Sequence, residues 1–204
     1  REMYRQRNTP LQHEYLQERF GKVFIIPEGG SNLNGVRGCT EIVSYAMPTA
    51  GYAYAFDHIC VACGTATTLA GIALSLHEGQ KAIAFPVLKN GAFLAQEMES
   101  LLTNYLASDL PSSLGSPASW ELVCDYHFGG YAKVNDDLLL FSQQFTQEHG
   151  VPLDYVYTAK MFYGVMDLLQ QGFFCKGDRL LLVHTGGLQG NVGMEERFQR
   201  FAKI

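Results

Sequence analysis

A stretch of small residues, "ACGTATTLAG" at 62–71, has the composition of a loop that could bind an anion. The apolar run "HICVAC" before it predicts a buried strand, and apolar residues at helical spacing after it predict a helix. The apolar face of that helix comprises Leu69, Ile72, Ala73 and Leu76. Thr67 or Thr68 is expected to cap the helix start. Free backbone N–H groups and the positive end of a helix dipole favour an anion there, above all a phosphate.

The loop departs from the two common signatures of nucleotide phosphate binding. In a P-loop a lysine and a Ser or Thr follow the second glycine, whereas the fifth residue after Gly64 is Leu69 and no lysine follows it. The G-x-G-x-x-G spacing of a dinucleotide site does not occur in the loop either. The local sequence therefore leaves two interpretations open, an anion site and a capped strand-to-helix turn without a ligand.

Short apolar segments and helical patterns alternate along the whole chain. Strands are predicted at 22–27, 58–63, 80–88, 120–126 and 179–185. Helices are predicted after the 62–71 loop and at 1–20, 37–46, 91–108, 136–149, 159–172 and 194–201, with linkers at 47–56 and 110–119. This order predicts an α/β fold with a mainly parallel sheet and flanking helices.

Polar or glycine-rich turns follow four of the predicted strands. They are "EGGSN" at 28–32, "CGTATT" at 63–68, "HFGGYAKVN" at 127–135 and "HTGGLQG" at 184–190. Ligands of open α/β sheets bind beyond the carboxyl ends of the strands. We therefore expect the four turns to converge on one site.

The composition favours a globular enzyme or small-ligand binder. Of the 204 residues, 47% are apolar and 17% charged, which suffices for a sizeable core. The net charge of −5 and the lack of a basic run argue against nucleic-acid binding, and no apolar run of about 18 residues predicts a membrane span. The five dispersed cysteines suit a reducing cytoplasm. Cys60 and Cys63, three apart on a strand, should point to opposite faces, so no metal site is expected.

Five ordered motifs resemble one family of pyridoxal-phosphate (PLP) enzymes, which contains D-cysteine desulfhydrase and 1-aminocyclopropane-1-carboxylate (ACC) deaminase. The motifs are "IPEGGSN" at 26–32, "CGTATTLAG" at 63–71, "DYHFGGYAKVND" at 125–136, "VYTAKMFYG" at 156–164 and "HTGG" at 184–187. Their order and spacing cover nearly the whole chain. The resemblance implies the fold of the tryptophan synthase β subunit, which is PLP fold type II.

The resemblance implies a cofactor phosphate site and two active-site tyrosines. The phosphate would be held by Gly64, Thr65, Ala66, Thr67 and Thr68. Tyr131 and Tyr157 resemble the tyrosines that face the substrate side of PLP. A nearby pyridinium or ammonium group makes a phenol easier to deprotonate, so either tyrosine is a candidate acid, base or nucleophile. The alternative interpretation is a pair of aromatic side chains that only pack.

Two threonines bear on which reaction is catalysed. Thr158 and Thr185 stand where ACC deaminases typically have glutamate and leucine, and both are the desulfhydrase-like residue. A glutamate beside the pyridine nitrogen would keep it protonated and make the ring a strong electron sink. A threonine offers only a neutral hydrogen bond, which suffices for an activated β-leaving group such as a thiol. Thr158 is also placed to cap the following helix, and the two roles are compatible.

The resemblance also implies a part that this chain lacks. The family's PLP-binding lysine, in a "GNK"-like motif, and its substrate-carboxylate loop lie upstream of anything in the sequence. Lys89, Lys133 and Lys160 do not stand in that motif. We therefore expect residues 1–20 to be the helical end of a small domain and residues 21–204 to be the large PLP-phosphate-binding domain.

The expected activity is that of a cytoplasmic, homodimeric lyase that acts on a small amino acid. In a D-cysteine desulfhydrase, β-elimination of the thiol gives pyruvate and ammonia. Two alternatives remain: ACC deaminase, and a catalytically silent domain that binds PLP or phosphate non-covalently.

Overall fold

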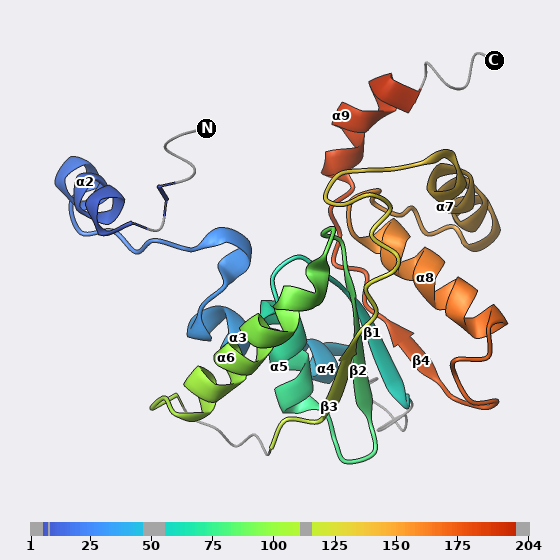
Figure 1. Cartoon of the computed structure of the whole chain (residues 1–204), viewed down its shortest axis with the longest axis horizontal. Helices are drawn as coiled ribbons and strands as arrows, with labels where there is room; N and C mark the ends of the chain where they lie inside the picture. Colours follow the sequence, from blue (N-terminus) through green and yellow to red (C-terminus); the bar gives the residue numbers. More distant parts are fainter. Residues whose placement is uncertain (1–5, 8, 47–55, 111–115, 199–204) are drawn as a thin grey trace.

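The centre of the molecule is a four-stranded parallel sheet with helices on both faces (Figure 1). The computed structural model describes residues 6–7, 9–46, 56–110 and 116–198. The strands are β1 (His58–Cys63), β2 (Lys81–Pro86), β3 (Ser119–Leu122) and β4 (Leu180–Leu182). Their order is β3-β2-β1-β4, and all three pairs are parallel. The predicted α/β fold with a parallel sheet is confirmed.

Strands β1 and β2 form the buried middle of the sheet. Their register runs from His58 opposite Lys81 to Cys63 opposite Pro86, and most of their residues are buried. Such strands carry apolar residues on both faces because helices cover both sides. Cys60 and Cys63 enter different core clusters, which confirms that they point to opposite faces.

Four helices cover one face of the sheet. They are α3 (Leu33–Cys39), α4 (Glu41–Ala46), α5 (Thr67–Ser75) and α6 (Leu94–Leu106), the last preceded by the 3₁₀ turn η2 (Gly91–Phe93). Helix α5 packs against the sheet and the other three helices, so it is buried on nearly every side. A Cβ atom at Gly71 would lie 2.4 Å from the Cβ of Cys39, so only glycine allows α3 and α5 to approach so closely.

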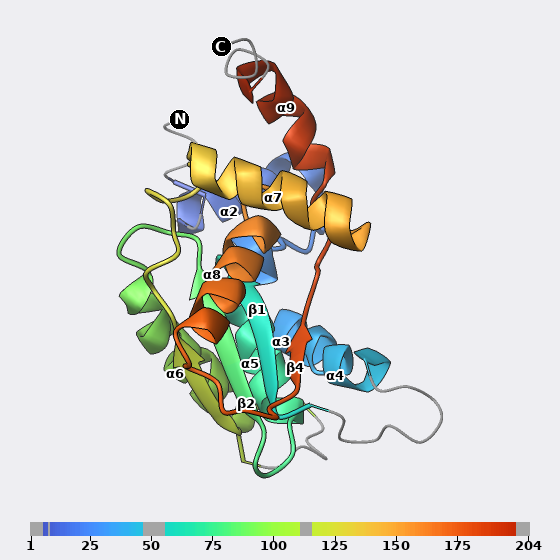
Figure 2. The same ribbon diagram turned by 90° about the vertical axis from the view of Figure 1, so that its right-hand side faces the viewer.

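Helix α8 (Thr158–Gln170) packs on the opposite face, and α7 (Asp136–His149) packs against α8. The side chain of Asn135 caps α7 by accepting a 3.0 Å hydrogen bond from the Leu138 N–H, and the helix ends at Gly150 with φ 69°. Helix α9 (Gln189–Phe198) extends away from this layer and stands above α7 in Figure 2.

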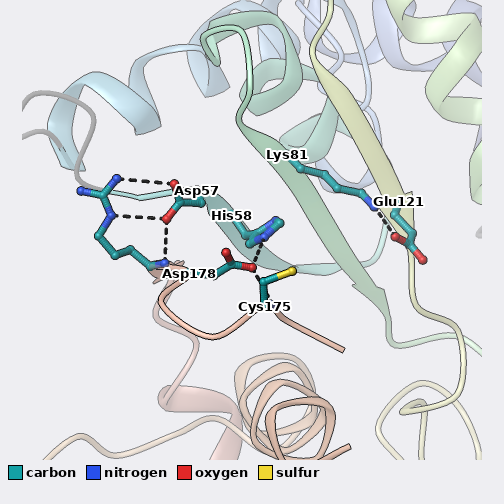
Figure 3. A network of polar contacts seen from close by, with 7 residues as sticks. Asp57, His58, Lys81, Glu121, Cys175 and Asp178 are labelled. Atoms are coloured by element: carbon teal, nitrogen blue, oxygen red, sulfur yellow. Dashed lines mark hydrogen bonds and ion pairs between the residues drawn. The ribbon is translucent and has the colours of Figure 1, made fainter. Parts of the chain in front are cut away.

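Polar contacts hold the amino ends of the strands (Figure 3). Two are ion pairs, Lys81 with Glu121 and Asp57 with Arg179, and the third is a hydrogen bond between His58 and Asp178. His58 Nε2 lies 3.0 Å from Asp178 Oδ2, which also accepts a 2.9 Å hydrogen bond from the backbone N–H of Cys175. These contacts tie the starts of β1 and β2 to β3 and to the segment before β4. The carboxyl ends of the strands carry the candidate site.

Two predictions for the first 46 residues are wrong. No strand forms at 22–27. No strand of the sheet pairs with this segment, and its Phe24 and Ile26 side chains are exposed. The predicted helix at 37–46 is two short helices, α3 and α4. The first begins at Leu33, earlier than predicted, because the side chain of Asn32 accepts from the Gly35 N–H at 2.8 Å and caps it.

The other predicted elements differ from the structure mainly at their ends. Of the predicted helix at 1–20, residues 10–20 form α2 (Pro10–Phe20), which has no buried residue, whereas the described residues 6, 7 and 9 are not helical. Strands β3 and β4 are shorter than predicted, and α9 begins at Gln189 instead of 194. The two predicted linkers lie largely outside the described residues, at 47–55 and 111–115. No helix of the described residues is both long and apolar enough to cross a membrane.

Candidate active site

The start of helix α5 presents backbone donors without a side-chain cap. Strand β1 ends at Cys63, and Gly64, Thr65 and Ala66 lead into the helix. The N-cap residue is Ala66, which makes no side-chain capping bond, and no acidic residue lies in the first turn. The N–H of Thr67 donates to the carbonyl of Thr65. The following N–H groups of an uncapped first turn can bind an anion. The geometry therefore suits a phosphate.

The expected cap by Thr67 or Thr68 is wrong. Both residues lie inside the first turn of α5, one step too late in the chain to accept from its free N–H groups. The hydroxyl of Thr67 lies 3.3 Å from the hydroxyl of Thr65, so Thr65 and Thr67 form a hydroxyl pair at the loop. The donors that a threonine cap would have occupied stay available.

The segment "EGGSN" lies directly against this loop. It contains the 3₁₀ turn η1 (Glu28–Gly30), in which Gly29 has φ 64°. A Cβ atom at Gly29 would lie 2.6 Å from the Thr65 hydroxyl oxygen, and one at Gly35 would lie 3.0 Å from a methyl carbon of Thr67. Two glycines thus leave room for the threonine side chains at the loop.

Tyr157 and Tyr131 meet on the other side of the same loop. A Cβ atom at Gly64 would lie 3.1 Å from Cε1 of Tyr157, so the phenol ring rests on the glycine. The rings of Tyr131 and Tyr157 meet edge to face, with centroids 5.9 Å apart. Tyr131 is 56% exposed and Tyr157 is half-buried. The structure therefore brings both predicted tyrosines beside the predicted phosphate loop.

The groups of this chain keep the Tyr157 phenol protonated. Burial raises its pKa above the usual range, and hydrogen bonding with Tyr131 and the charges of Asp154 and Glu28 act in the same direction. A protonated phenol can donate a proton or a hydrogen bond. Easier deprotonation of this tyrosine, as expected from the sequence, stays a prediction that needs a cation beside the ring.

Asp154, which is not among the site residues predicted from the sequence, organises the start of helix α8. Its carboxylate accepts from the N–H groups of Val156, Tyr157 and Thr158 at 3.1, 2.8 and 2.8 Å, and from the Thr158 hydroxyl at 2.6 Å. The carboxylate therefore fixes the turn that leads into α8 and binds the first N–H of the helix, that of Thr158. The predicted capping role of Thr158 is wrong, because the N-cap position is Tyr157, which makes no side-chain cap bond. Asp154 stands in the sequence as "LDYVYT", four positions before the first residue of α8.

The two threonines expected near the pyridine ring differ in their surroundings. Thr158 is fully buried, and its hydroxyl donates to Asp154 and accepts from the Asp154 N–H at 3.0 Å. Thr185 is exposed and makes no hydrogen bond within the described residues. The turn after Thr185 lies beside the cap of α8, since a Cβ atom at Gly187 would be 3.3 Å from Cγ of Asp154.

His184 fixes that turn as a neutral imidazole. Its Nε2 lies 2.9 Å from the carbonyl oxygen of Pro152 and therefore donates, while Nδ1 accepts from the Gly186 N–H at 3.0 Å. Both ring nitrogens are thus used to hold the backbone that carries Thr185. His184 has no other expected role.

Lys160 is the other functional candidate that the sequence did not single out as important. It is fully buried on α8, and its Nζ donates to the carbonyl oxygens of His127 and Gly130 at 3.0 and 2.7 Å. Burial lowers its pKa to about 8, against the attraction of Asp154. Lys133 and Lys89 are exposed and lie along the same turn. The apolar neighbours of a lysine in "TAKMF" give a weak sequence signal of burial.

The chain is similar to known proteins of one family. Residues 4–186 match the family model described as pyridoxal-phosphate dependent enzyme. Similar proteins include a putative ACC deaminase of Pyrococcus horikoshii, 31% identical over 87% of this chain and 53% of its own. A bifunctional D-cysteine desulfhydrase/ACC deaminase of Arabidopsis thaliana, described as mitochondrial, is 30% identical over 94% of this chain and 47% of its own. A D-cysteine desulfhydrase of Klebsiella pneumoniae is 30% identical over 80% of this chain and 50% of its own.

A solved structure shows the same fold. The crystal structure of an ACC deaminase homologue superposes with a TM-score of 0.75 at 27% identity and covers 92% of this chain and 56% of its own. The chain spans about half the length of the curated relatives it matches. These matches confirm the fold and the cofactor class expected from the five motifs. The chain belongs to the family of pyridoxal-phosphate-dependent enzymes.

Proposed function

We propose that the protein containing this chain is a PLP-dependent lyase of the D-cysteine desulfhydrase type, which eliminates a thiol from a D-amino acid and yields pyruvate and ammonia. The observation that carries the choice is the pair of neutral threonines at positions 158 and 185. Thr158 is fully buried and stands where the resemblance places glutamate in ACC deaminases, and Thr185 stands where it places leucine. Relatives bearing both names match the chain at about 30% identity, so family membership alone does not choose between them.

The loop at the start of α5 fits the phosphate of PLP. It offers uncapped N–H groups at a helix start, the hydroxyls of Thr65 and Thr67, and a first turn free of acidic residues. PLP, when bound, supplies an electron sink that stabilises a carbanion at the substrate's α-carbon. In this proposal residues 64–68 hold the phosphate, and Tyr157, whose ring rests on Gly64, lies where the loop meets the substrate side.

Thr185 is the better candidate for the pyridine nitrogen. An unprotonated ring nitrogen needs a hydrogen-bond donor, and the only hydroxyl proton of Thr158 is already directed to Asp154 at 2.6 Å. The Thr185 hydroxyl is free among the described residues, on a turn that His184 fixes. A neutral donor does not keep the nitrogen protonated. This suits departure of a thiol, which is a good leaving group, better than opening of a cyclopropane.

Tyr157 and Tyr131 move or hold protons on the substrate side. The raised pKa of Tyr157 keeps its hydroxyl as a donor, which can protonate or hydrogen-bond the leaving sulfur. Tyr131, more exposed and in contact with the edge of the Tyr157 ring, would orient the substrate from the solvent side.

The covalent partner of PLP lies, in this proposal, outside the 204 residues. The Nζ of Lys160 donates to two backbone carbonyls, and Lys81 pairs with Glu121 at the opposite end of β2. Residues 1–20 would be the end of a small domain, in agreement with the lack of buried residues in α2, and the protein would be a homodimer.

Turnover of D-cysteine against ACC by the intact protein tests the substrate. We expect pyruvate from D-cysteine with a kcat/KM at least tenfold above that for 2-oxobutyrate from ACC. Faster ACC turnover would reject the desulfhydrase assignment. Borohydride reduction with PLP, followed by peptide mass analysis, tests the lysine: a pyridoxyl adduct on Lys89, Lys133 or Lys160 would contradict the proposal.

A further inference from the structure

The turn that carries Tyr131 has a backbone that few residues adopt. Phe128 and Ala132 have φ values of 52° and 53°, and the two glycines between them have φ values of 91° and 119°. Positive φ is uncommon for phenylalanine and alanine and persists only where surrounding contacts impose it. The turn 127–132 therefore needs a partner outside itself.

The hydrogen bonds within the turn join residues that are only two or three positions apart in the sequence. The Gly129 N–H donates to Nδ1 of His127, the Gly130 N–H to the carbonyl of His127, and the Lys133 N–H to the carbonyl of Gly130. None of them ties the turn to the rest of the molecule. That contact comes from helix α8.

Two residues of α8 supply it. The ring of Tyr163 meets the ring of Phe128 edge to face, with centroids 5.0 Å apart, and Lys160 reaches the backbone of the turn. Its Nζ donates to the carbonyls of His127 and Gly130, which flank the bend, at 3.0 and 2.7 Å. The side chain is fully buried and has no ion pair within the described residues, so backbone carbonyls are its hydrogen-bond acceptors. A buried lysine is rare because removing its charge from water is costly. The desolvation of Lys160 is therefore a cost in stability that its contacts with the turn must offset.

The same helical turn carries the second tyrosine. Tyr157 lies three residues before Lys160, so one rigid element holds Tyr157 directly and holds the neighbour of Tyr131 through the ammonium. We infer that Lys160 is a positioning residue: it clamps the 127–130 backbone and thereby sets the edge-to-face geometry of Tyr131 and Tyr157 over the phosphate loop. Its effect on catalysis rests on the proposed function, whereas the clamp itself does not.

Hydrogen–deuterium exchange on the intact protein tests the clamp without any turnover. Lys160→Met keeps the length and apolar stem of the side chain and removes its donors. We expect exchange in peptides spanning 126–133 to accelerate at least tenfold, with α6 unchanged. Val165→Ala, at another buried position of α8, is the matched control and should leave the 126–133 peptides as in the wild type. Wild-type exchange in Lys160→Met would overturn the inference.

A second variant covers the case in which Lys160→Met does not fold. Lys160→Gln keeps two N–H donors on a shorter side chain that cannot span both carbonyls, so the same peptides should still exchange at least threefold faster. Wild-type exchange in this variant would overturn the inference as well.

Kinetics then separate the clamp from the proposed reaction. With D-cysteine, a loosened turn should lower kcat at least tenfold in Lys160→Met while Val165→Ala stays within twofold of the wild type. A loosened turn with unchanged kcat refutes the positioning role. If the wild type itself does not turn over D-cysteine, the proposed function fails, and the exchange data alone decide on the clamp.

Discussion

Gly29 and Gly30 allow a direct test of the contact between the "EGGSN" turn and the phosphate loop. Both have φ 64°, so alanine at either position adds the same backbone strain of about 1–2 kcal/mol. They differ in what a Cβ atom would meet. At Gly29 it would lie 2.6 Å from the Thr65 hydroxyl oxygen and 2.7 Å from its methyl carbon, whereas at Gly30 it would meet nothing within 4 Å. The pair therefore isolates displacement of Thr65 from backbone strain.

The expected effect follows from these distances. Gly29→Ala must push Thr65 aside, which adds about 1–3 kcal/mol of overpacking to the strain that both variants share. If Thr65 donates to the phosphate, its displacement removes one hydrogen bond to a charged group, worth about 1.5–3 kcal/mol. The dissociation constant for the phosphorylated ligand should therefore rise about 10- to 100-fold in Gly29→Ala and stay near wild type in Gly30→Ala.

Pyridoxine 5′-phosphate is the suitable ligand because it has no aldehyde and reports only non-covalent binding. Fluorescence titration of the intact apoprotein gives its dissociation constant, and phosphate-free pyridoxine controls for contacts to the ring. Thermal unfolding of both variants checks that they are folded at the assay temperature. Equal dissociation constants for Gly29→Ala and Gly30→Ala would refute the assignment of Thr65 to the phosphate site.

Three further outcomes are expected. Tyr157→Phe should lower kcat for D-cysteine about 10²- to 10⁴-fold, as loss of a proton donor does, and leave pyridoxine 5′-phosphate binding within twofold; an unchanged kcat would exclude the acid role. Asp154→Ala should lower the free energy of unfolding in urea by about 3–5 kcal/mol, because it leaves the buried N–H and hydroxyl of Thr158 and the partly buried N–H of Tyr157 without an acceptor. Asn135→Ala, which removes the single-bond cap of α7, should cost about 1 kcal/mol, and equal losses would contradict this argument. Burial in the folded state lowers the pKa of Lys160 from 10.5 to about 8. Between these two pH values the unfolded chain therefore holds a proton that the folded chain has released. The free energy of unfolding of the wild type should rise with pH across this range, relative to Lys160→Met, by up to about 3 kcal/mol. A flat difference across that range in urea unfolding would show that the buried amine is not titrating.

The sequence predicts those elements whose signals are local. Helix α7 begins and ends where it was predicted because Asn135 and Gly150 mark its two ends. The strand 58–63 and the following loop are equally well marked, by an apolar run that ends in small residues. The positions of the turns at 63–68, 127–135 and 184–190 also follow, because parallel strands place all their carboxyl ends at one edge. The turn at 28–32 follows no strand and reaches the site through its contact with Thr65.

What the sequence did not predict depends on contacts between distant segments. The segment 22–27 has the composition of a strand but does not pair with any strand of the sheet. Whether a segment pairs depends on the arrangement of the whole sheet, which the local sequence does not contain. Lys160 is buried because two carbonyls about 30 positions upstream accept from it, and no periodicity in "TAKMF" carries that information. The N-cap of α5 is Ala66 and not Thr67, so the helix starts one residue earlier than a threonine cap requires. Sequence patterns do not locate a helix start to within one residue.

The contrast between two helix starts explains where an anion can bind in this site. Helices α2, α3 and α7 are each capped by the side chain of their N-cap residue, and the first N–H of α8 donates to the carboxylate of Asp154. That carboxylate occupies a donor of the α8 start and repels a phosphate by its charge. Helix α5 begins close by, since Tyr157 at the start of α8 rests on Gly64, yet α5 has neither a side-chain cap nor an acid in its first turn. Of these two neighbouring helix starts, the negative charge built into α8 therefore directs an anionic ligand to α5.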